Sequence, residues 1–174
     1  MNIIVNGHPK SGTHALLKAV ELLGQPAEIG HFYDASQVPE GISHFFHIKR
    51  DPRNVLLSWM RFNGVAITDG MYMSKFRGFD GSMSFVESAS RYTHWLNGPV
   101  YNVKFEELIA NESVMQGIAG YLGVDYLENA FLSLPGLTPT WTGEYSDYTT
   151  IWTPAVDNMW LSEGGAELQA AWGY

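Results

Sequence analysis

The chain has 174 residues, 45% of them hydrophobic, with 6 Trp, 9 Tyr and 9 Phe, which suffices for one well-buried core and leaves little for a second. The absence of Cys excludes disulfides, thiolate metal ligands and cysteine nucleophiles, and it is consistent with a reducing compartment. No apolar run approaches the roughly 20 residues that cross a bilayer, and the first residues lack the features of a signal peptide. We therefore expect residues 1–174 to form a single domain of a cytoplasmic protein that is not bound to a membrane.

The formal net charge of -8 is spread unevenly along the chain. All Lys and Arg residues lie at or before Lys104, whereas residues 105–174 contain acids and no base. The overall charge argues against broad nucleic-acid binding. The distribution predicts that any strongly anionic ligand is bound by the first part of the chain.

The first half of the sequence alternates apolar runs with helical periodicity. Asn2 to Asn6 predicts a strand, and Thr13 to Leu23 predicts a helix after a tight loop. His44 to Ile48 predicts a second strand, which leads into the basic turn Lys49 to Pro52. A helix from about Arg53 to Phe62 should follow, with four buried side chains: Val55, Leu56, Trp59 and Phe62.

In the second half of the sequence, only some segments have a pattern that predicts secondary structure. Asn63 to Ser82 is rich in Gly and Met without periodicity and predicts a long mobile loop. We expect a helix over Met83 to Leu96, a third strand over Pro99 to Phe105 and a helix over Asn111 to Leu122. The tail beyond Leu134 is left unassigned. Three strands separated by helices predict an α/β fold, a three-layer α/β/α arrangement with a central parallel sheet.

The loop between the first strand and the first helix has the composition of a phosphate-binding loop. Gly7-His8-Pro9-Lys10-Ser11-Gly12-Thr13 leads into a helix N-terminus, where backbone N–H groups and the helix dipole attract anions. The Walker pattern has Lys and a Mg²⁺-binding hydroxyl directly after the second Gly, but here Thr13 and His14 follow Gly12 and the Lys lies earlier. A sulfuryl group carries less negative charge than a phosphoryl group. The loop therefore suits metal-independent sulfuryl transfer better than phosphoryl transfer.

The same loop resembles the donor loop of the sulfotransferase family, Pro-Lys-Ser-Gly-Thr-Thr. Pro9 to Thr13 match it, and His14 stands in the last place. The resemblance implies the P-loop NTPase-like sulfotransferase fold and the donor 3′-phosphoadenosine 5′-phosphosulfate (PAPS), which leaves as 3′,5′-adenosine bisphosphate (PAP). It implies a small-molecule or glycan acceptor of unknown identity and leaves a homodimer open. A glycine-rich turn arisen by chance is the alternative.

A second motif follows the second strand. Family members carry an Arg and, eight positions later, a Ser that bind the 3′-phosphate of the donor, and Arg50 and Ser58 match this spacing. In a third match, Phe105 takes the place of the family's aromatic residue beside the adenine, although core packing explains a Phe there equally well. The resemblance thus implies a set of donor-binding residues: Lys10, Ser11, Gly12, Thr13, His14, Arg50, Ser58 and Phe105.

The resemblance also implies a catalytic base before the central strand. His31 occupies a position similar to that of the family's catalytic His, and Glu28 is the alternative, since some members use Glu. The alternative is that His31 is a structural or surface histidine without a catalytic role. Lys10 and backbone N–H groups would stabilise the leaving 5′-phosphate. His8 and His14 flank a helix N-terminus, which disfavours imidazolium, so we expect them to be neutral.

The sequence departs from the family in its tail. Gly143 to Tyr148 is faintly similar to the family's Gly-x-x-Gly-Asp-Trp, but no Arg-Lys-Gly clamp for the 3′-phosphate follows Lys104. Either Arg50, Ser58 and backbone N–H groups suffice, or Lys75 and Arg77 fold over the nucleotide; we favour the second. The acceptor pocket or lid should come from the aromatic tail and from the same loop, through Met71, Tyr72, Met73, Phe76 and Phe79; ordinary packing of the loop is the alternative.

Two other functions stay open at this point. One is a phosphotransferase built on a similar sheet. The other is a non-catalytic nucleotide-binding module of sulfotransferase ancestry. Scattered His residues without Cys do not form a metal site.

Overall fold

A parallel four-stranded sheet with the strand order β2-β1-β3-β4 organises the chain in the computed structural model, which describes residues 2–135 and 147–174. In chain order the elements are β1 (Ile3–Asn6), α1 (Thr13–Leu22), β2 (Glu28–Gly30), η1 (Ala35–Gln37), β3 (His44–Lys49), α2 (Pro52–Phe62), α3 (Asp69–Arg77), α4 (Phe85–Ser90), η2 (Thr93–Asn97), β4 (Tyr101–Lys104), α5 (Phe105–Ala110), α6 (Glu112–Leu122), α7 (Ala130–Ser133), η3 (Tyr148–Thr150), α8 (Pro154–Ser162) and α9 (Gly165–Trp172).

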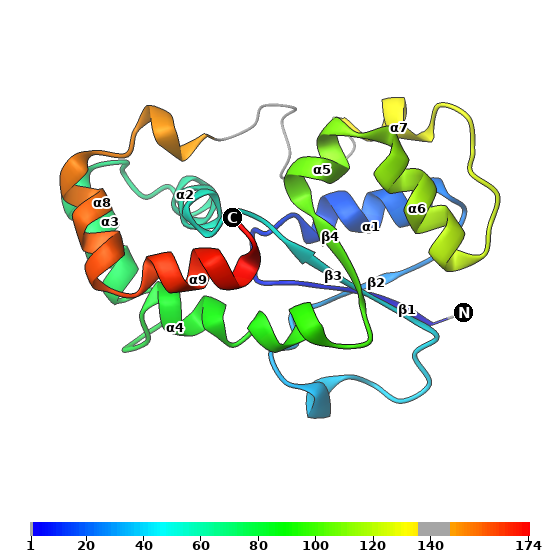
Figure 1. The fold of residues 1–174 in the computed structure, drawn as a ribbon, viewed down its shortest axis with the longest axis horizontal. Coiled ribbons are helices and arrows are strands. Elements are labelled where there is room, and N and C mark those ends of the chain that lie inside the picture. The colour runs from blue at the N-terminus through cyan, green and yellow to red at the C-terminus, as the bar shows by residue number, and fades with distance from the viewer. Residues whose placement is uncertain (1, 136–146) are drawn as a thin grey trace.

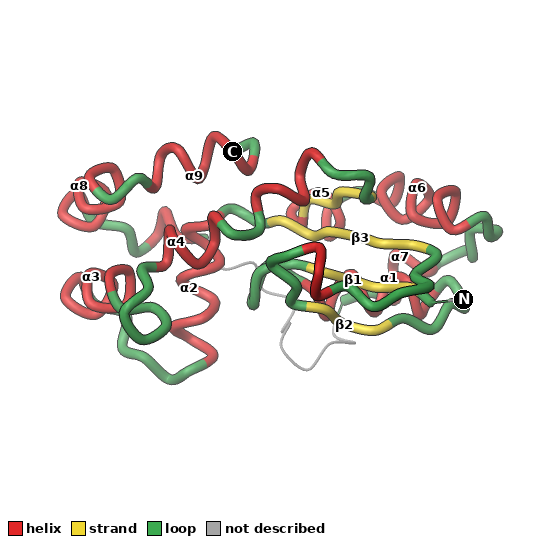
Figure 2. Tube along the Cα trace, turned by 90° about the horizontal axis from the view of Figure 1, so that it is seen from below, coloured by secondary structure: helices red, strands yellow, loops and turns green. Residues whose placement is uncertain are grey.

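The helices form two groups around this sheet (Figures 1 and 2). Helices α1, α5, α6 and α7 lie alongside the strands. Helices α2, α3, α4, α8 and α9 gather at the end toward which β3 runs into α2 (Figure 1). Because all strands are parallel, their carboxyl ends face this second group together.

Alternation along the strands divides the apolar residues between two cores. Ile3 and Val5 point into the cluster built with α1, α5, α6 and α7, whereas Ile4 points into the cluster built with the second helix group. In β3, Phe46 joins the first cluster and Phe45 the second. Both faces of the sheet are therefore buried, as expected for a parallel sheet.

The predicted α/β class with a central parallel sheet flanked by helices is confirmed. The first strand, the helix after it and the helix Glu112–Leu122 lie within one residue of their predicted ends. The strand Glu28–Gly30 was not predicted; it pairs in parallel with β1, with Val5 opposite Ile29. Its three residues are too short to show a periodicity.

The prediction of a mobile loop over residues 63–82 was wrong. Helix α3 begins where the Thr68 hydroxyl accepts a hydrogen bond from the Met71 amide, 3.3 Å away, and it buries Tyr72 and Phe76, four residues apart. The Gly and Met residues of this stretch mask that short apolar stripe. Tyr72 and Phe76 are therefore core residues and not part of an acceptor lid.

Two further expectations need correction. Phe62 ends α2 with 62% of its surface exposed, and Met60 is the buried residue of that last turn. The helix predicted over residues 83–96 is broken into α4 and η2. The Ser84 hydroxyl and Glu87 carboxylate form a reciprocal capping box that starts α4.

The unassigned tail contains η3, α8 and α9 in its described part. Trp160 and Trp172 of these helices are buried in the second cluster, beside α3 and α4. No helix among the described residues is long and apolar enough to cross a bilayer.

We predict that the core on the α1 side contributes strongly to stability. Leu16 is completely buried in α1, so Leu16→Ala should lower the free energy of unfolding by about 2–5 kcal/mol. Leu132→Ala makes the same change in α7 at a side chain that is 72% exposed, and it should alter the free energy by no more than about 0.5 kcal/mol. Urea unfolding followed by circular dichroism compares the two; equal losses would contradict this assignment of the core.

Candidate active site

The loop after β1 forms a backbone concavity at the start of α1. Lys10 and Gly12 have positive φ angles of 72° and 108°, and Gly12 caps α1 without any side-chain hydrogen bond. The N–H groups of the first helical turn have no intrahelical acceptor, so they are available to an anion. Alternating backbone conformations of this kind form the nests that bind phosphates.

Ser11 can offer its hydroxyl to an anion, but not its backbone N–H. Its N–H donates to the His8 carbonyl over 3.0 Å, so this N–H is already used inside the loop. Its hydroxyl oxygen is buried and has no hydrogen-bond partner among the described residues. A buried hydroxyl without a partner is costly unless a ligand satisfies it, so the loop fits a phosphate-bearing donor.

The Lys10 side chain reaches from the loop to Phe62, the last residue of α2. Its ammonium nitrogen is 3.0 Å from the centroid of the Phe62 ring, a cation–π contact. Partial burial lowers the pKa of Lys10. The exposed position of Phe62, which the sequence did not reveal, thus provides an aromatic surface for the lysine of the loop.

The ring of Phe105 joins this loop to the turn after β3. A Cβ on Gly12 would lie 2.4 Å from the Phe105 ring, so only glycine allows this approach. The Arg50 guanidinium stacks over the same ring, 4.5 Å from its centroid. Phe105 and Arg50 are both almost fully buried. The two predicted anion-binding turns therefore meet at one edge of the sheet.

Phe105 itself is the first residue of α5 and not the end of a strand. Its ring contacts Gly12 and Arg50. Phe105 also belongs to the first core cluster. Ser58, the other residue predicted at the 3′-phosphate, is half-buried in α2, the helix that directly follows the Arg50 turn.

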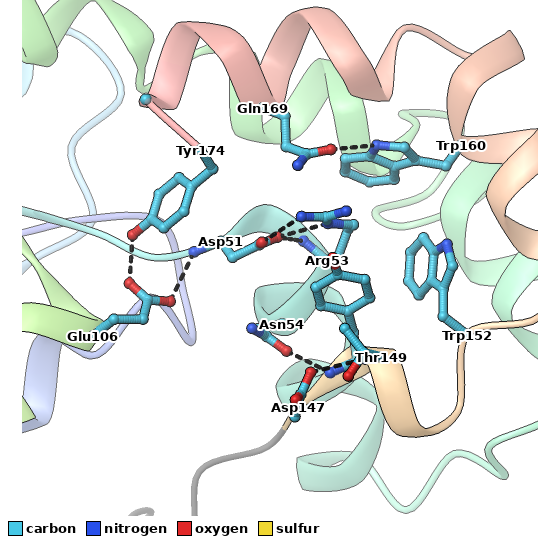
Figure 3. A network of polar contacts seen from close by, with 12 residues as sticks. Asp51, Arg53, Asn54, Glu106, Asp147, Thr149, Trp152, Trp160, Gln169 and Tyr174 are labelled. Atoms are coloured by element: carbon cyan, nitrogen blue, oxygen red, sulfur yellow. Dashed lines mark hydrogen bonds and ion pairs between the residues drawn. The ribbon is translucent and has the colours of Figure 1, made fainter.

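Hydrogen bonds from three segments fix the Arg50 turn, as Figure 3 shows. Asp51 caps α2 and holds Arg53 in a two-pronged ion pair with a closest approach of 2.7 Å. The Glu106 carboxylate accepts one hydrogen bond from the Asp51 amide at 3.1 Å and one from the Tyr174 hydroxyl at 2.5 Å. Glu106 and Tyr174 were not found from the sequence, because nothing local links these two positions.

The described end of the tail motif packs against α2. The Tyr148 amide donates to the Asn54 side chain over 2.8 Å, and the Arg53 guanidinium lies 3.8 Å from the centroid of the Tyr148 ring. The rest of the motif, from Gly143 to Ser146, lies outside the described residues, as do Trp141 and Thr142.

His31 follows the carboxyl end of β2 and faces the loop. Its Nδ1 lies 2.7 Å from the Gly7 carbonyl oxygen. Because a carbonyl only accepts, Nδ1 carries the proton and the lone pair of Nε2 is left for another group. Glu28 lies at the opposite end of β2, where it pairs with Ile4 in the strand register. His31 therefore lies beside the loop, and Glu28 does not.

A cavity of about 350 Å³ opens beside His31. Its volume lies in the range of small-molecule sites. Of the residues predicted for the acceptor pocket, Phe79 lines it. Its walls also include Pro9, Trp59, Met83, Ser88 and Tyr92.

The histidines around the loop are held in their neutral forms. Burial lowers the pKa of His8 to about 4 and that of His47 to about 3. Burial also lowers the pKa of His14, and the charges of Lys10 and His31 act in the same direction. His8 and His14 were expected to be neutral because of the helix dipole; the structure gives burial as the main cause.

The expectation that Arg77 folds over the nucleotide gains no support. Arg77 forms an ion pair of 2.8 Å with Glu163, which follows α8, so its charge is engaged within the second helix group. Among residues 2–135 and 147–174, no group of three or more His, Asp and Glu side chains is placed to hold a metal ion.

Comparison with known proteins supports the fold. The sequence matches no protein-family profile and no curated protein sequence. Among solved structures, the chain is similar to mouse sulfotransferase SULT7A1 complexed with PAP, with a TM-score of 0.69 and 13% identity, over 98% of this chain and 86% of that chain. At this identity the likeness shows a shared sulfotransferase fold.

We predict that stability falls in mild acid. The folded pKa values of His8 and His47 lie below the ordinary value of 6.5, so the unfolded chain binds protons that the folded chain does not. Stability should therefore be complete above pH 6.5 and decline as the pH falls from 6.5 toward 4. Urea midpoints between pH 7.5 and 4.5 measure this. His47→Gln should show a shallower decline, and an identical slope would contradict the assignment.

Proposed function

We propose that the protein is a sulfotransferase that transfers a sulfuryl group from PAPS to a hydroxyl or amine acceptor. One observation carries the proposal: the Phe105 ring brings the Lys10 loop and the Arg50 turn to the same edge of the sheet. A nucleotide with phosphates at both its 5′ and 3′ positions needs two such sites at once. The shared fold with a sulfotransferase complexed with PAP is a further support.

The Lys10 loop would bind the 5′ side of the donor. The N–H groups at the start of α1, the Ser11 hydroxyl and the Lys10 ammonium would bind one anion together, and they would stabilise the negative charge of the leaving 5′-phosphate. His14 lies in the first turn of α1 and stays neutral, so it would serve as a hydrogen-bonding group.

The Arg50 turn would bind the 3′ side. The Arg50 guanidinium presents a planar fork that matches phosphate oxygens, and Ser58 adds a hydroxyl from α2. The face of the Phe105 ring packs against the Arg50 guanidinium. The 3′-phosphate distinguishes this donor from ATP.

His31 would accept the proton of the acceptor. The acceptor oxygen or nitrogen, bound in the 350 Å³ cavity, attacks sulfur while its proton passes to Nε2 of His31. The bond between sulfur and the 5′-phosphate oxygen breaks, and PAP leaves with the electron pair of that bond. The protein contributes position and charge, and the residues present supply both.

Nucleotide binding tests the first part of the proposal. Lys10→Ala should weaken PAP binding about 10-fold or more, because it removes a charge-assisted contact to phosphate. Lys18→Ala, which removes a half-buried lysine of α1 paired with Glu21, should leave the affinity unchanged. Isothermal titration with PAP and with ATP plus magnesium decides the outcome. Preference for ATP with magnesium would instead indicate a phosphotransferase.

Sulfate transfer tests the second part. His31→Ala should lower the rate of transfer from labelled PAPS about 100-fold or more while PAP affinity is kept, because the base is lost and the donor loop is not. His44→Ala removes a half-buried histidine at the start of β3, at the end of the sheet away from the loop, and is the matched control. Phenol, arylamine and monosaccharide acceptors are compared. Binding of PAP without transfer to any of them would indicate a non-catalytic nucleotide-binding module.

A further inference from the structure

The segment that carries His31 is held by buried side chains, although the imidazole itself is exposed. Residues 31 and 32 follow β2 and belong to no helix or strand. An exposed loop residue is usually mobile. Here its backbone is bound by Asn6 of β1, by Tyr92 before η2 and by Trp95 within η2, all of them buried.

Asn6 extends the pairing of β1 with β2 through its side chain. The last backbone pair of the two strands is Asn6 with Gly30. Beyond it, the Asn6 amide oxygen accepts from the Phe32 N–H at 2.8 Å, and the amide nitrogen donates to the Phe32 carbonyl at 3.0 Å. The side-chain amide thus offers one acceptor and one donor, as a backbone peptide group does.

Two aromatic donors bind the same backbone segment. The Tyr92 hydroxyl donates to the His31 carbonyl at 3.0 Å, and the Trp95 indole N–H donates to the Phe32 carbonyl at 2.8 Å. Burial raises the pKa of Tyr92 to about 12, so its hydroxyl keeps its proton at any working pH. Both carbonyls of the segment are therefore bound by side chains that are themselves fixed in the second core cluster.

The consequence concerns the ring of His31. With its backbone held, the imidazole donates from Nδ1 to the carbonyl of Gly7, the first residue of the phosphate loop. That contact sets the tautomer and ties the orientation of the ring to the loop itself. A base whose orientation is set before the substrates bind requires no reorganisation during the reaction.

We propose that Asn6, Tyr92 and Trp95 are positioning residues that hold His31 against the phosphate loop in one orientation, with Nε2 free to accept a proton. The inference rests on the proposed function only in that it takes His31 to be the catalytic base. The orientation and tautomer of His31 can be measured without any acceptor.

Nitrogen-15 spectra of histidine-labelled protein test the arrangement directly. Two-bond proton–nitrogen correlations distinguish the Nδ1–H from the Nε2–H tautomer, and His31→Gln assigns the signals. In the unsubstituted protein the neutral His31 ring should be the Nδ1–H tautomer. Tyr92→Phe keeps the ring and removes the donor, so it should yield a mixture of both tautomers. Trp95→Phe should do the same.

A buried tyrosine elsewhere in the same core provides the control. The Tyr72 hydroxyl is buried and has no hydrogen-bond partner among the described residues. Tyr72→Phe therefore makes the same chemical change without touching His31, and the tautomer should stay as in the unsubstituted protein. A general loosening of the core would alter both variants alike.

Kinetics with PAPS provide the second readout. Tyr92→Phe should lower kcat on the order of 10- to 100-fold, because the base is misplaced, while the affinity for PAP stays within about twofold.

The inference is overturned if the unsubstituted protein shows the Nε2–H tautomer, or if Tyr92→Phe retains the Nδ1–H tautomer. If the unsubstituted protein transfers no sulfate, the proposed function fails, and the tautomer comparison still decides the positioning role. If Trp95→Phe does not fold, Tyr92→Phe carries the test alone.

Discussion

The contact of the Phe105 ring with Gly12 on one side and Arg50 on the other is the constraint on which the site depends. Gly12 needs both its positive φ and its missing Cβ, since any larger residue would collide with the ring. Arg50 is a buried cation, which is costly unless it is well supported, and the ring face offers such support. The parallel sheet brings the ends of β1, β3 and β4 to one edge, and this ring sets the spacing between the turns that follow them.

The second helix group completes the site from the opposite side. Without it, the carboxyl edge of the sheet would be a shallow surface carrying two basic turns. Helix α2 contributes Trp59 to the cavity wall and Phe62 to the Lys10 contact, and the segment between α3 and α4 contributes Phe79 and Met83. Aromatic rings of this group pack around His8, and burial lowers its pKa, so His8 adds no positive charge beside the loop. Helical packing and site electrostatics thus have a common origin.

The sequence revealed those parts of the site that are local in the chain. The Lys10 loop and the Arg50 turn are contiguous motifs between a strand and a helix. The composition and place of the Lys10 loop predicted it, and the resemblance to the sulfotransferase family pointed to the Arg50 turn. Contacts between distant positions were invisible: Glu106 with Tyr174, Asn54 with Tyr148 and Asn6 with Phe32 each join segments that no periodicity connects. Helix α3 was missed because one glycine and two methionines interrupt its stripe of two aromatic residues. Phe62 was misplaced because α2 ends at that residue, where the side chain is exposed.

The tail contains no Lys or Arg, but it holds the Arg50 turn in place through hydrogen bonds. In the described part of the tail, Tyr174 binds Glu106, which in turn binds the Asp51 amide, and Lys104 donates to the Gly173 carbonyl over 3.0 Å. These bonds supply rigidity and not positive charge. The acidic second part of the chain would repel a phosphate, whereas Asp51 is neutralised by Arg53 within the turn itself. An anion at this edge is therefore attracted by Arg50 and by Lys10, and the tail contributes by holding the backbone between β3 and α2 in place.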